Sequence, residues 1–384
     1  MPPFRISSCS GELVGHRQAN VLLRKPGFRD GGLVLEGAHS SSLSRRDFMR
    51  GASAAFALAG ARQARAAWDG WIDVHHHLAP PAYSAFQRTL DQFPPALKSL
   101  TPQRALDAMN LAGVRMAITS IASPGVWAGN YAKAVDLARA CNEYAAELMA
   151  RFPGRFGMFA TLPLPSVRAG LPPSLDGSLR EVAHAFDTLK ANGVQLWTNY
   201  GDKWLGDPFL DPLFEELDRR KAVIFVHPRV APCCTNLLPH ITANVVEYGT
   251  ETTRAIANFV FNGASTRFRN VRMIFSHAGG TMPFLISRFL VEASTPIMKN
   301  ALPTGILPEL ARFYYETAQT THPAPMSALR RVVPVSHILY GSDFPYRSLA
   351  EQISALRDGN VFSDEELRLI ARVNAADLLR RRAT

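Results

Sequence analysis

The chain has 384 residues, of which 47% are hydrophobic and 19% are charged, and its formal net charge is +10. This composition supplies enough apolar material for one large core and argues against disorder after the first stretch of the chain. Ten basic and four acidic residues lie within residues 1–67, so most of the net charge belongs to that segment. The remainder lacks the basic excess of a nucleic-acid-binding protein.

Residues 1–67 are predicted to be a leader that carries a twin-arginine signal. The sequence SRRDFM at residues 44–49 precedes a small-residue apolar run at 51–60 and the cleavage-site pattern ARA at 64–66. A short amphipathic helix is the alternative, but the run is too apolar and too rich in alanine for one. We therefore expect a periplasmic protein exported by the twin-arginine route. We expect no membrane span, because no later segment of sufficient length lacks charge.

Residues 68–384 are predicted to form a single (β/α)₈ barrel domain. Short β-branched or apolar runs alternate with longer stretches of helical period, which is the pattern of βα units around a parallel sheet. Strands are predicted at residues 71–74, 114–121, 155–162, 193–198, 222–226, 271–276, 313–317 and 337–340. Helices are predicted at 102–111, 131–151, 179–191, 212–220, 251–261, 282–292, 325–332 and 364–382. The segment 228–249 is expected to be a long loop over the active face.

The chemically informative residues stand at the carboxyl ends of predicted strands. His75 and His77 close the first strand, and alternation turns them to the same side. His227 closes the fifth strand, His277 the sixth and Asp343 the eighth. In a parallel barrel these strand ends converge on one mouth. Because imidazole and carboxylate groups suit zinc or a similar divalent ion, the sequence predicts a catalytic metal site.

The motifs around these residues resemble those of the amidohydrolase superfamily. They are IDVHHH at 72–77, VHP at 226–228, SHAGG at 276–280 and GSDFP at 341–345. The resemblance spans about residues 70–380. Within the superfamily, the motifs are most similar to those of the branch that includes aminocarboxymuconate-semialdehyde decarboxylase. YETA at 315–318 is most similar to the salicylate-type decarboxylases of that branch.

This resemblance implies a set of metal ligands. His75, His77, His227 and Asp343 would bind one divalent ion, with zinc as the first candidate and manganese or cobalt as alternatives. His277 would act on the substrate or on metal-bound water instead of binding the ion. A second metal usually needs a bridging lysine at the end of the fourth strand, and residues 193–199 contain no lysine.

The predicted function is a mononuclear metal-dependent, non-oxidative decarboxylase of a hydroxylated, salicylate-like aromatic acid. His277 and Asp343 are its predicted catalytic residues. One alternative is a hydrolase of a lactone, ester or amide, because a metal can also lower the pKa of its bound water from about 16 to roughly 7. A second alternative is a metal-binding barrel without turnover.

The substrate contacts predicted from the sequence are Arg288, Trp197, Asn199 and Phe284. Arg288 matches a family arginine that grips a substrate carboxylate, in some members across a dimer interface, although an ordinary surface salt bridge is an equal alternative. The aromatic residues near strand ends suit a flat ring. Relatives that act on acyclic dicarboxylates have a further arginine between the first and second strands. Here the only candidate before Arg104 is Arg88, in a segment that aligns poorly, which favours a monocarboxylic phenol as the substrate. A homodimer is implied by the resemblance alone.

Overall fold

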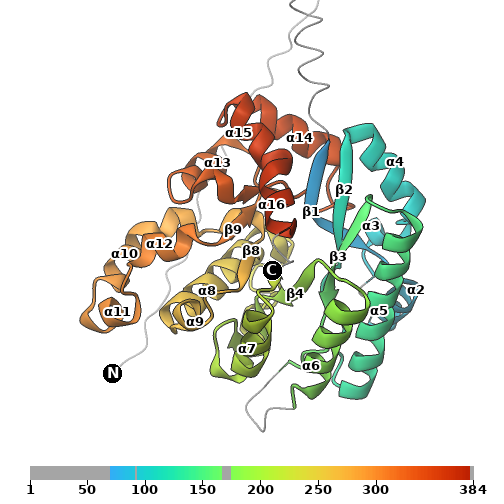
Figure 1. Cartoon of the computed structure of the whole chain (residues 1–384), viewed down its shortest axis with the longest axis horizontal. Coiled ribbons are helices and arrows are strands. Elements are labelled where there is room, and N and C mark those ends of the chain that lie inside the picture. The colour runs from blue at the N-terminus through green and yellow to red at the C-terminus, as the bar shows by residue number, and fades with distance from the viewer. Residues whose placement is uncertain (1–69, 91–92, 167–173, 381–384) are drawn as a thin grey trace, which may run out of the picture. The chain divides into compact units, whose positions relative to one another are not determined.

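The computed structural model describes residues 70–90, 93–166 and 174–380, and the predicted leader lies outside these ranges. In the described part, eight strands form one parallel sheet with helices packed around it (Figure 1). The strands of this sheet are β1 (Trp71–Leu78), β2 (Val114–Ile121), β3 (Phe156–Thr161), β4 (Gly193–Trp197), β7 (Val223–His227), β8 (Arg272–Phe275), β9 (Tyr314–Glu316) and β10 (Ile338–Leu339). A separate antiparallel pair is formed by β5 (Asn199–Tyr200) and β6 (Lys203–Trp204).

Helices connect successive strands of the sheet. The α-helices are α2 (Pro81–Thr89), α3 (Pro95–Lys98), α4 (Pro102–Ala112), α5 (Tyr131–Arg151), α6 (Asp176–Ala183), α7 (Asp211–Arg219), α8 (Glu247–Phe261), α9 (Ala264–Arg267), α10 (Ile286–Ala293), α11 (Pro296–Ala301), α12 (Ile306–Ala311), α13 (Pro323–Arg330), α14 (Leu349–Asp358), α15 (Asp364–Arg368) and α16 (Asn374–Arg380). None of the helices in the described ranges is long and apolar enough to cross a membrane.

The sheet closes between its first and last strands. Around the ring the strand order follows the chain order, from β1 to β10. The backbone N–H of Val74 donates to the carbonyl of Tyr340 at 3.0 Å, and the N–H of Asp343 donates to the carbonyl of His75 at 2.9 Å. This is the topology of a (β/α)₈ barrel, which confirms the predicted fold.

The barrel interior is apolar toward the amino ends of the strands. One buried cluster takes members from six of the eight strands and from α16, so it lies inside the barrel: Ile72, Val74, Ile118, Phe159, Val223, Phe225, Ile274, Leu339, Ala375 and Leu378. A larger cluster fills the layer between the strands and the outer helices. Because apolar side chains fill one end of the interior, its polar groups gather at the carboxyl ends of the strands.

Strand β1 changes its phase just before the first predicted ligand. Ile72 and Val74 both belong to the interior cluster, so strict alternation would place His76 inside and turn His75 and His77 outward. The pairing of β1 with β2 is irregular immediately before His76, as expected of a β-bulge. As a result His75 and His77 both face the interior, where their rings lie 5.0 Å apart.

The helices differ from the predicted ones in several places, and α2, α3, α9, α11 and α12 were not predicted. Helix α14 was not predicted, although the Ser348 hydroxyl caps it by accepting from the N–H of Glu351, a recognisable S-x-x-E pattern. The predicted helix 282–292 begins as a 3₁₀ turn, Met282–Leu285, before α10. The predicted helix 364–382 is α15 and α16 with a π-helical turn, Leu369–Val373, between them.

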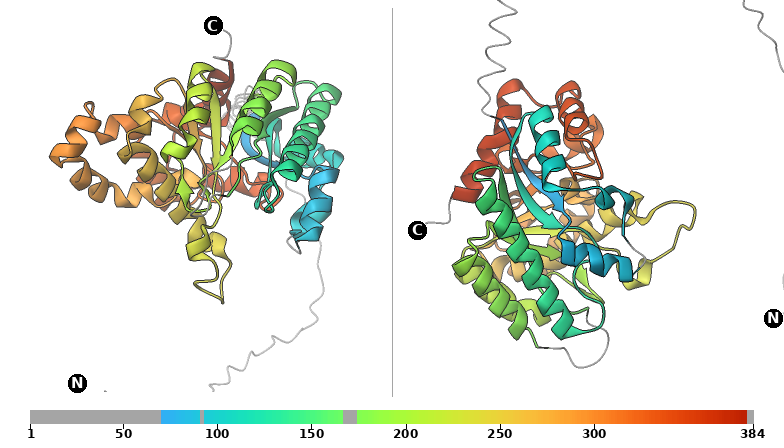
Figure 2. Two further views of the ribbon diagram at one scale, coloured as in Figure 1. Left: turned by 90° about the horizontal axis from the view of Figure 1, so that it is seen from below. Right: turned by 90° about the vertical axis from the view of Figure 1, so that its right-hand side faces the viewer.

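The loop between β7 and α8 contains only short 3₁₀ turns, at Pro232–Cys234 and Ala243–Val245. Both views in Figure 2 show this yellow segment projecting from the barrel on the same side as α2 and α3, drawn in blue. This arrangement agrees with the long loop expected over the active face.

Candidate metal centre

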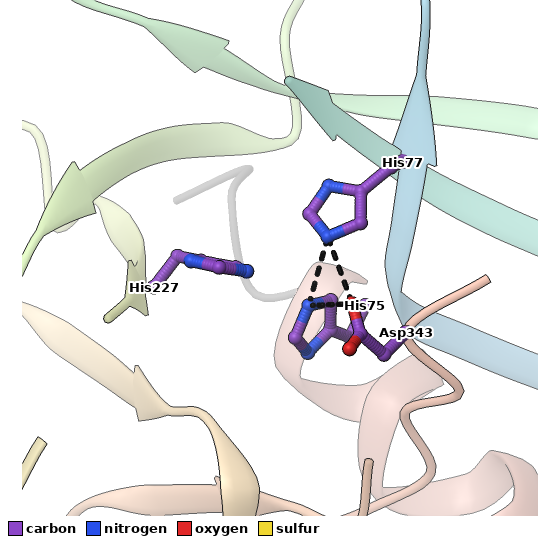
Figure 3. A group of neighbouring side chains, drawn as sticks. All are labelled: His75, His77, His227 and Asp343. Carbon is purple, nitrogen blue, oxygen red and sulfur yellow. Dashed lines mark hydrogen bonds and ion pairs between the residues drawn. The ribbon is translucent and has the colours of Figure 1, made fainter. Parts of the chain in front are cut away.

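Four side chains converge at the carboxyl ends of three strands (Figure 3). His75 and His77 come from β1, His227 ends β7, and Asp343 lies in the turn after β10. All four are buried, and their candidate ligand atoms lie within 4.8 Å of one another. Asp343 Oδ1 is 2.9 Å from His77 Nε2 and 3.2 Å from His75 Nε2. Three imidazole nitrogens and one carboxylate oxygen in so small a space fit a divalent cation.

Hydrogen bonds set the orientation of two of these imidazoles. His75 Nδ1 lies 2.9 Å from Glu316 Oε1, and His227 Nδ1 lies 2.8 Å from the carbonyl oxygen of Pro228. A carbonyl or an ionised carboxylate only accepts, so Nδ1 carries the proton in both rings. In the neutral form of each ring, Nε2 then presents its lone pair to the shared space, as metal-ligating histidines do.

The electrostatics at this position favour a cation. Burial lowers the pKa of His75, but the carboxylates of Glu316 and Asp343 outweigh it and raise that pKa to about 10. Burial and the neighbouring imidazoles hold the pKa of His227 well below its ordinary value. Burial raises the pKa of Asp343, but His75 and His77 outweigh burial and hold it well below its usual range. The centre therefore offers an ionised carboxylate and a neutral His227, and it stabilises positive charge next to them.

The Asp343 turn is held in an unusual backbone conformation. Asp343 has a φ of 61°, in the left-handed region that non-glycine residues adopt mainly where the surrounding structure imposes it. The Asp73 carboxylate accepts from the N–H of Ser342 at 3.0 Å and from its hydroxyl at 2.6 Å. It also accepts from the N–H of His75 at 3.0 Å. Asp73 thereby links the two chain segments that carry three of the four ligands.

Glu316 is a functional residue that sequence reasoning missed. It is fully buried at the end of β9, and its Oε1 accepts both from His75 Nδ1 and from the N–H of His277 at 2.7 Å. A Cβ at Gly341 would lie 2.0 Å from Glu316 Oε2, so only glycine leaves room for this carboxylate. The signal available in the sequence is an acidic residue near the end of a predicted strand that is otherwise mainly apolar.

His277 lies beside the four-residue group and not within it. Its ring centroid is 5.2 Å from that of His75. Its Nδ1 donates to the carbonyl of Ala318 at 2.9 Å, while its Nε2 is buried without a hydrogen-bond partner among the described residues. An imidazole whose Nε2 has no protein partner can form a hydrogen bond with a bound molecule or exchange a proton with it. Its predicted catalytic role stays a prediction.

A cavity of about 410 Å³ opens above this centre. It is lined by His77, Pro94, Ala122, Ser123, Pro124, His227, Thr242, Ala243, Asn244, Tyr248, Gln319, Asp343, Tyr346 and Arg347. The three residues 242–244 come from the loop expected over the active face. The ring of Tyr346 lies 5.5 Å from that of His77, and the ring of Tyr248 lies 6.1 Å from that of His227. The volume and the aromatic walls suit a small ring compound.

The predicted substrate contacts do not line this cavity. Trp197 is buried, with its ring 5.4 Å from that of His227. The Asn199 amide donates to Glu251 at 2.9 Å. Phe284 is 62% exposed, and Arg288 is exposed on α10. Within one chain, Trp197 is therefore the only one of the four that lies next to a proposed metal ligand. The assignment of all four residues as substrate contacts stays a prediction.

The fold is a (β/α)₈ barrel, and a buried group of three histidines and one aspartate lies at the carboxyl ends of its strands. This combination defines the class of barrel enzymes that bind a metal ion. A family model described as Amidohydrolase matches residues 72–381. The chain belongs to the amidohydrolase family.

Known relatives extend over most of the chain. Decarboxylase yanB of Aspergillus niger is 33% identical over 326 residues, which cover 81% of this chain and 87% of the relative. The 6-methylsalicylic acid decarboxylase of Penicillium expansum is 35% identical over 290 residues, covering 71% and 84%. The solved dihydroxybenzoic acid decarboxylase of Polaromonas sp. JS666, with bound manganese and 2-nitroresorcinol, superposes with a TM-score of 0.69 at 18% identity, covering 82% and 98%. At that identity this structure supports the fold alone.

Proposed function

We propose that this protein is a mononuclear metal-dependent decarboxylase of a hydroxylated aromatic acid. The observation that carries the proposal is the buried group of His75, His77, His227 and Asp343, three of which line the 410 Å³ cavity. Both sequence relatives described above carry the name decarboxylase, and one of them is named for 6-methylsalicylic acid. The volume of the cavity and the tyrosines in its lining suit a ring compound of that size.

Zinc is our first candidate for the ion, because three imidazoles and one carboxylate are common zinc ligands. Manganese is the alternative, since a structural neighbour holds it. When bound, the ion supplies positive charge that stabilises the negative charge developing on the substrate as carbon dioxide leaves.

The protein side chains would manage the proton. In decarboxylation the bond from the ring to the carboxyl carbon breaks, its electron pair stays on the ring carbon, and that carbon takes up a proton. Asp343 is ionised, so it must first accept a proton, for which the substrate's hydroxyl group is a suitable source, before delivering it to the ring carbon. The phenoxide left behind then takes up a proton from solvent and leaves as the neutral phenol. The free Nε2 of His277 would orient the substrate or relay the proton.

Release of carbon dioxide from a panel of hydroxybenzoates tests this function. We expect turnover of at least one salicylate-type acid, loss of that turnover after chelation, and recovery on adding zinc or manganese. A metal-loaded protein that instead cleaves aryl esters or lactones without releasing carbon dioxide would support the hydrolase alternative. Bound metal without either activity would support the non-catalytic alternative.

Two further proposals concern assembly and location. Exposed apolar side chains gather on helices α10 and α11, including Val291 at 71% and Ile297 at 74% exposure. A surface of this kind marks an association site, and we assign it to a second copy of the chain, with light scattering as the test.

Export by the twin-arginine route stays a proposal from residues 44–66. It is tested by cell fractionation with Arg45 and Arg46 both changed to Lys.

A further inference from the structure

The cavity above the metal centre has one cationic side chain among its described lining residues, Arg347. Asp343 is the only acidic residue in the same lining, and it belongs to the metal group. Arg347 is solvent-exposed, which places it toward the open side of the cavity. An anionic ligand entering the cavity therefore meets a positive charge that belongs to the wall and not to the metal.

The backbone holds Arg347 close to the metal group. The N–H groups of Tyr346 and Arg347 both donate to the carbonyl of Asp343, at 2.8 and 3.3 Å. Ser348 then caps the first turn of α14 with its side chain. Arg347 thus lies between a tight turn at a proposed ligand and a capped helix, so its Cα has little freedom to move away from the cavity.

The guanidinium of Arg347 forms no ion pair with an acidic residue in the described part of the chain. Some other exposed arginines there form ion pairs, such as Arg219 with Glu216 and Arg368 with Glu365. Arg347 donates a hydrogen bond to the carbonyl of Asp343 through its backbone N–H and not through its side chain. Its five side-chain donors are therefore available to a ligand, and their planar arrangement matches a carboxylate.

The charges of the substrate and of the products indicate which of them this cation would bind. An aromatic acid enters with a carboxylate charge, whereas both products, a phenol and carbon dioxide, are neutral near pH 7. A cation in the wall therefore binds the substrate and not the phenol product. The arginine predicted for this task from the sequence, Arg288, is exposed on α10 and does not line the cavity of its own chain.

We propose that Arg347 binds the carboxylate of the aromatic acid and makes the site selective for the acid over its phenol product. This inference rests on the proposed function for the identity of the ligand. An interaction made with the carboxylate before the reaction strengthens ground-state binding, so its loss raises KM more than it lowers kcat.

The test compares binding of 2-hydroxybenzoate and of phenol to the metal-loaded protein by calorimetry. Arg347→Gln should weaken 2-hydroxybenzoate binding on the order of tenfold, with phenol binding unchanged. Arg347→Lys should lose less, and the difference from wild type should shrink at high salt. Arg331→Gln is the matched control, because Arg331 is an exposed arginine at the end of α13 and outside the cavity lining.

Several results would overturn the inference. They are equal binding of 2-hydroxybenzoate by wild type and Arg347→Gln, an equal loss for phenol, no binding of the acid by wild type, or a loss seen with Arg288→Gln in place of Arg347→Gln. Thermal unfolding and metal content of each variant show that the fold and the centre survive. Carbon dioxide release is measured separately. Acid binding that depends on Arg347 without turnover would refute the proposed function and leave this inference standing.

Discussion

The carboxylate of Glu316 and the imidazole of His75 form a buried pair in which Oε1 lies 2.9 Å from Nδ1. Neither side chain is exposed to solvent. The same oxygen accepts from the backbone N–H of His277, so one carboxylate orients a proposed ligand and fixes the backbone of a proposed catalytic residue. Partners of this kind tune metal affinity although they do not touch the ion.

Glu316→Gln tests this relationship. The variant keeps the shape of the side chain but removes its charge, so the orientation and basicity of His75 should suffer. We expect metal affinity to fall roughly tenfold to a hundredfold, measured as metal retained on dialysis against a competing chelator. Glu309→Gln is the control, because Glu309 is a buried carboxylate paired with Arg269 and Arg312 away from the centre. An equal loss of metal in both variants would contradict the assigned role of Glu316.

Asp343→Asn tests the proposed ligand and proton carrier. Asparagine tolerates the left-handed conformation at φ 61° better than most residues, so the fold should persist. The amide can neither take up nor deliver the proton, and we expect carbon dioxide release to fall at least about a hundredfold. Circular dichroism and metal content accompany the rate. Full activity in this variant would refute the role.

Metal binding should depend on pH through His75. In the metal-free protein, burial lowers the pKa of His75, but Glu316 and Asp343 outweigh it and raise the value to about 10. His75 is therefore protonated at neutral pH without metal and must lose that proton to bind the ion. His227 has a lowered pKa and is already neutral. Apparent affinity should then rise about tenfold for each pH unit between roughly pH 7 and 9.

Calorimetry of metal binding in buffers of different ionisation enthalpy measures the proton release directly. We expect about one proton released per ion at pH 7.5. Release of no proton, together with an affinity that does not change with pH, would contradict the role of His75 as a ligand that exchanges a proton for the metal.

Gly341→Ala should disturb the centre without changing any ligand. The added Cβ would lie 2.0 Å from Glu316 Oε2 and 3.0 Å from His75 Cβ, so Glu316 would have to move. We expect a loss of about 1–3 kcal/mol in the free energy of unfolding and weaker metal retention. Gly249→Ala is the control, because its Cβ would meet nothing closer than 3.7 Å. Thermal denaturation and metal analysis of both variants measure the difference, and a stable, metal-replete Gly341→Ala protein would show that the close approach is not required.

Local patterns in the sequence predicted the barrel and the four-residue group well. Alternating strand and helix periods identified all eight strands, because strand and helix periodicity is a property of neighbouring residues. The strand-end positions of His75, His77, His227 and Asp343 followed from those boundaries, since a parallel barrel gathers all such ends at one mouth. The motif resemblance narrowed the family, and the family match agrees with it.

The tertiary structure decided what depends on contacts between distant segments. The phase change in β1 that turns His75 inward depends on its pairing with β2. Glu316 meets His75 across 241 positions of sequence, so no local window relates them. No sequence pattern singles out Arg347, which the turn at Asp343 places in the cavity wall. Sequence periodicity reports how each segment forms, whereas the orientation of a side chain and its partners arise only when the ring of strands closes and brings remote segments together.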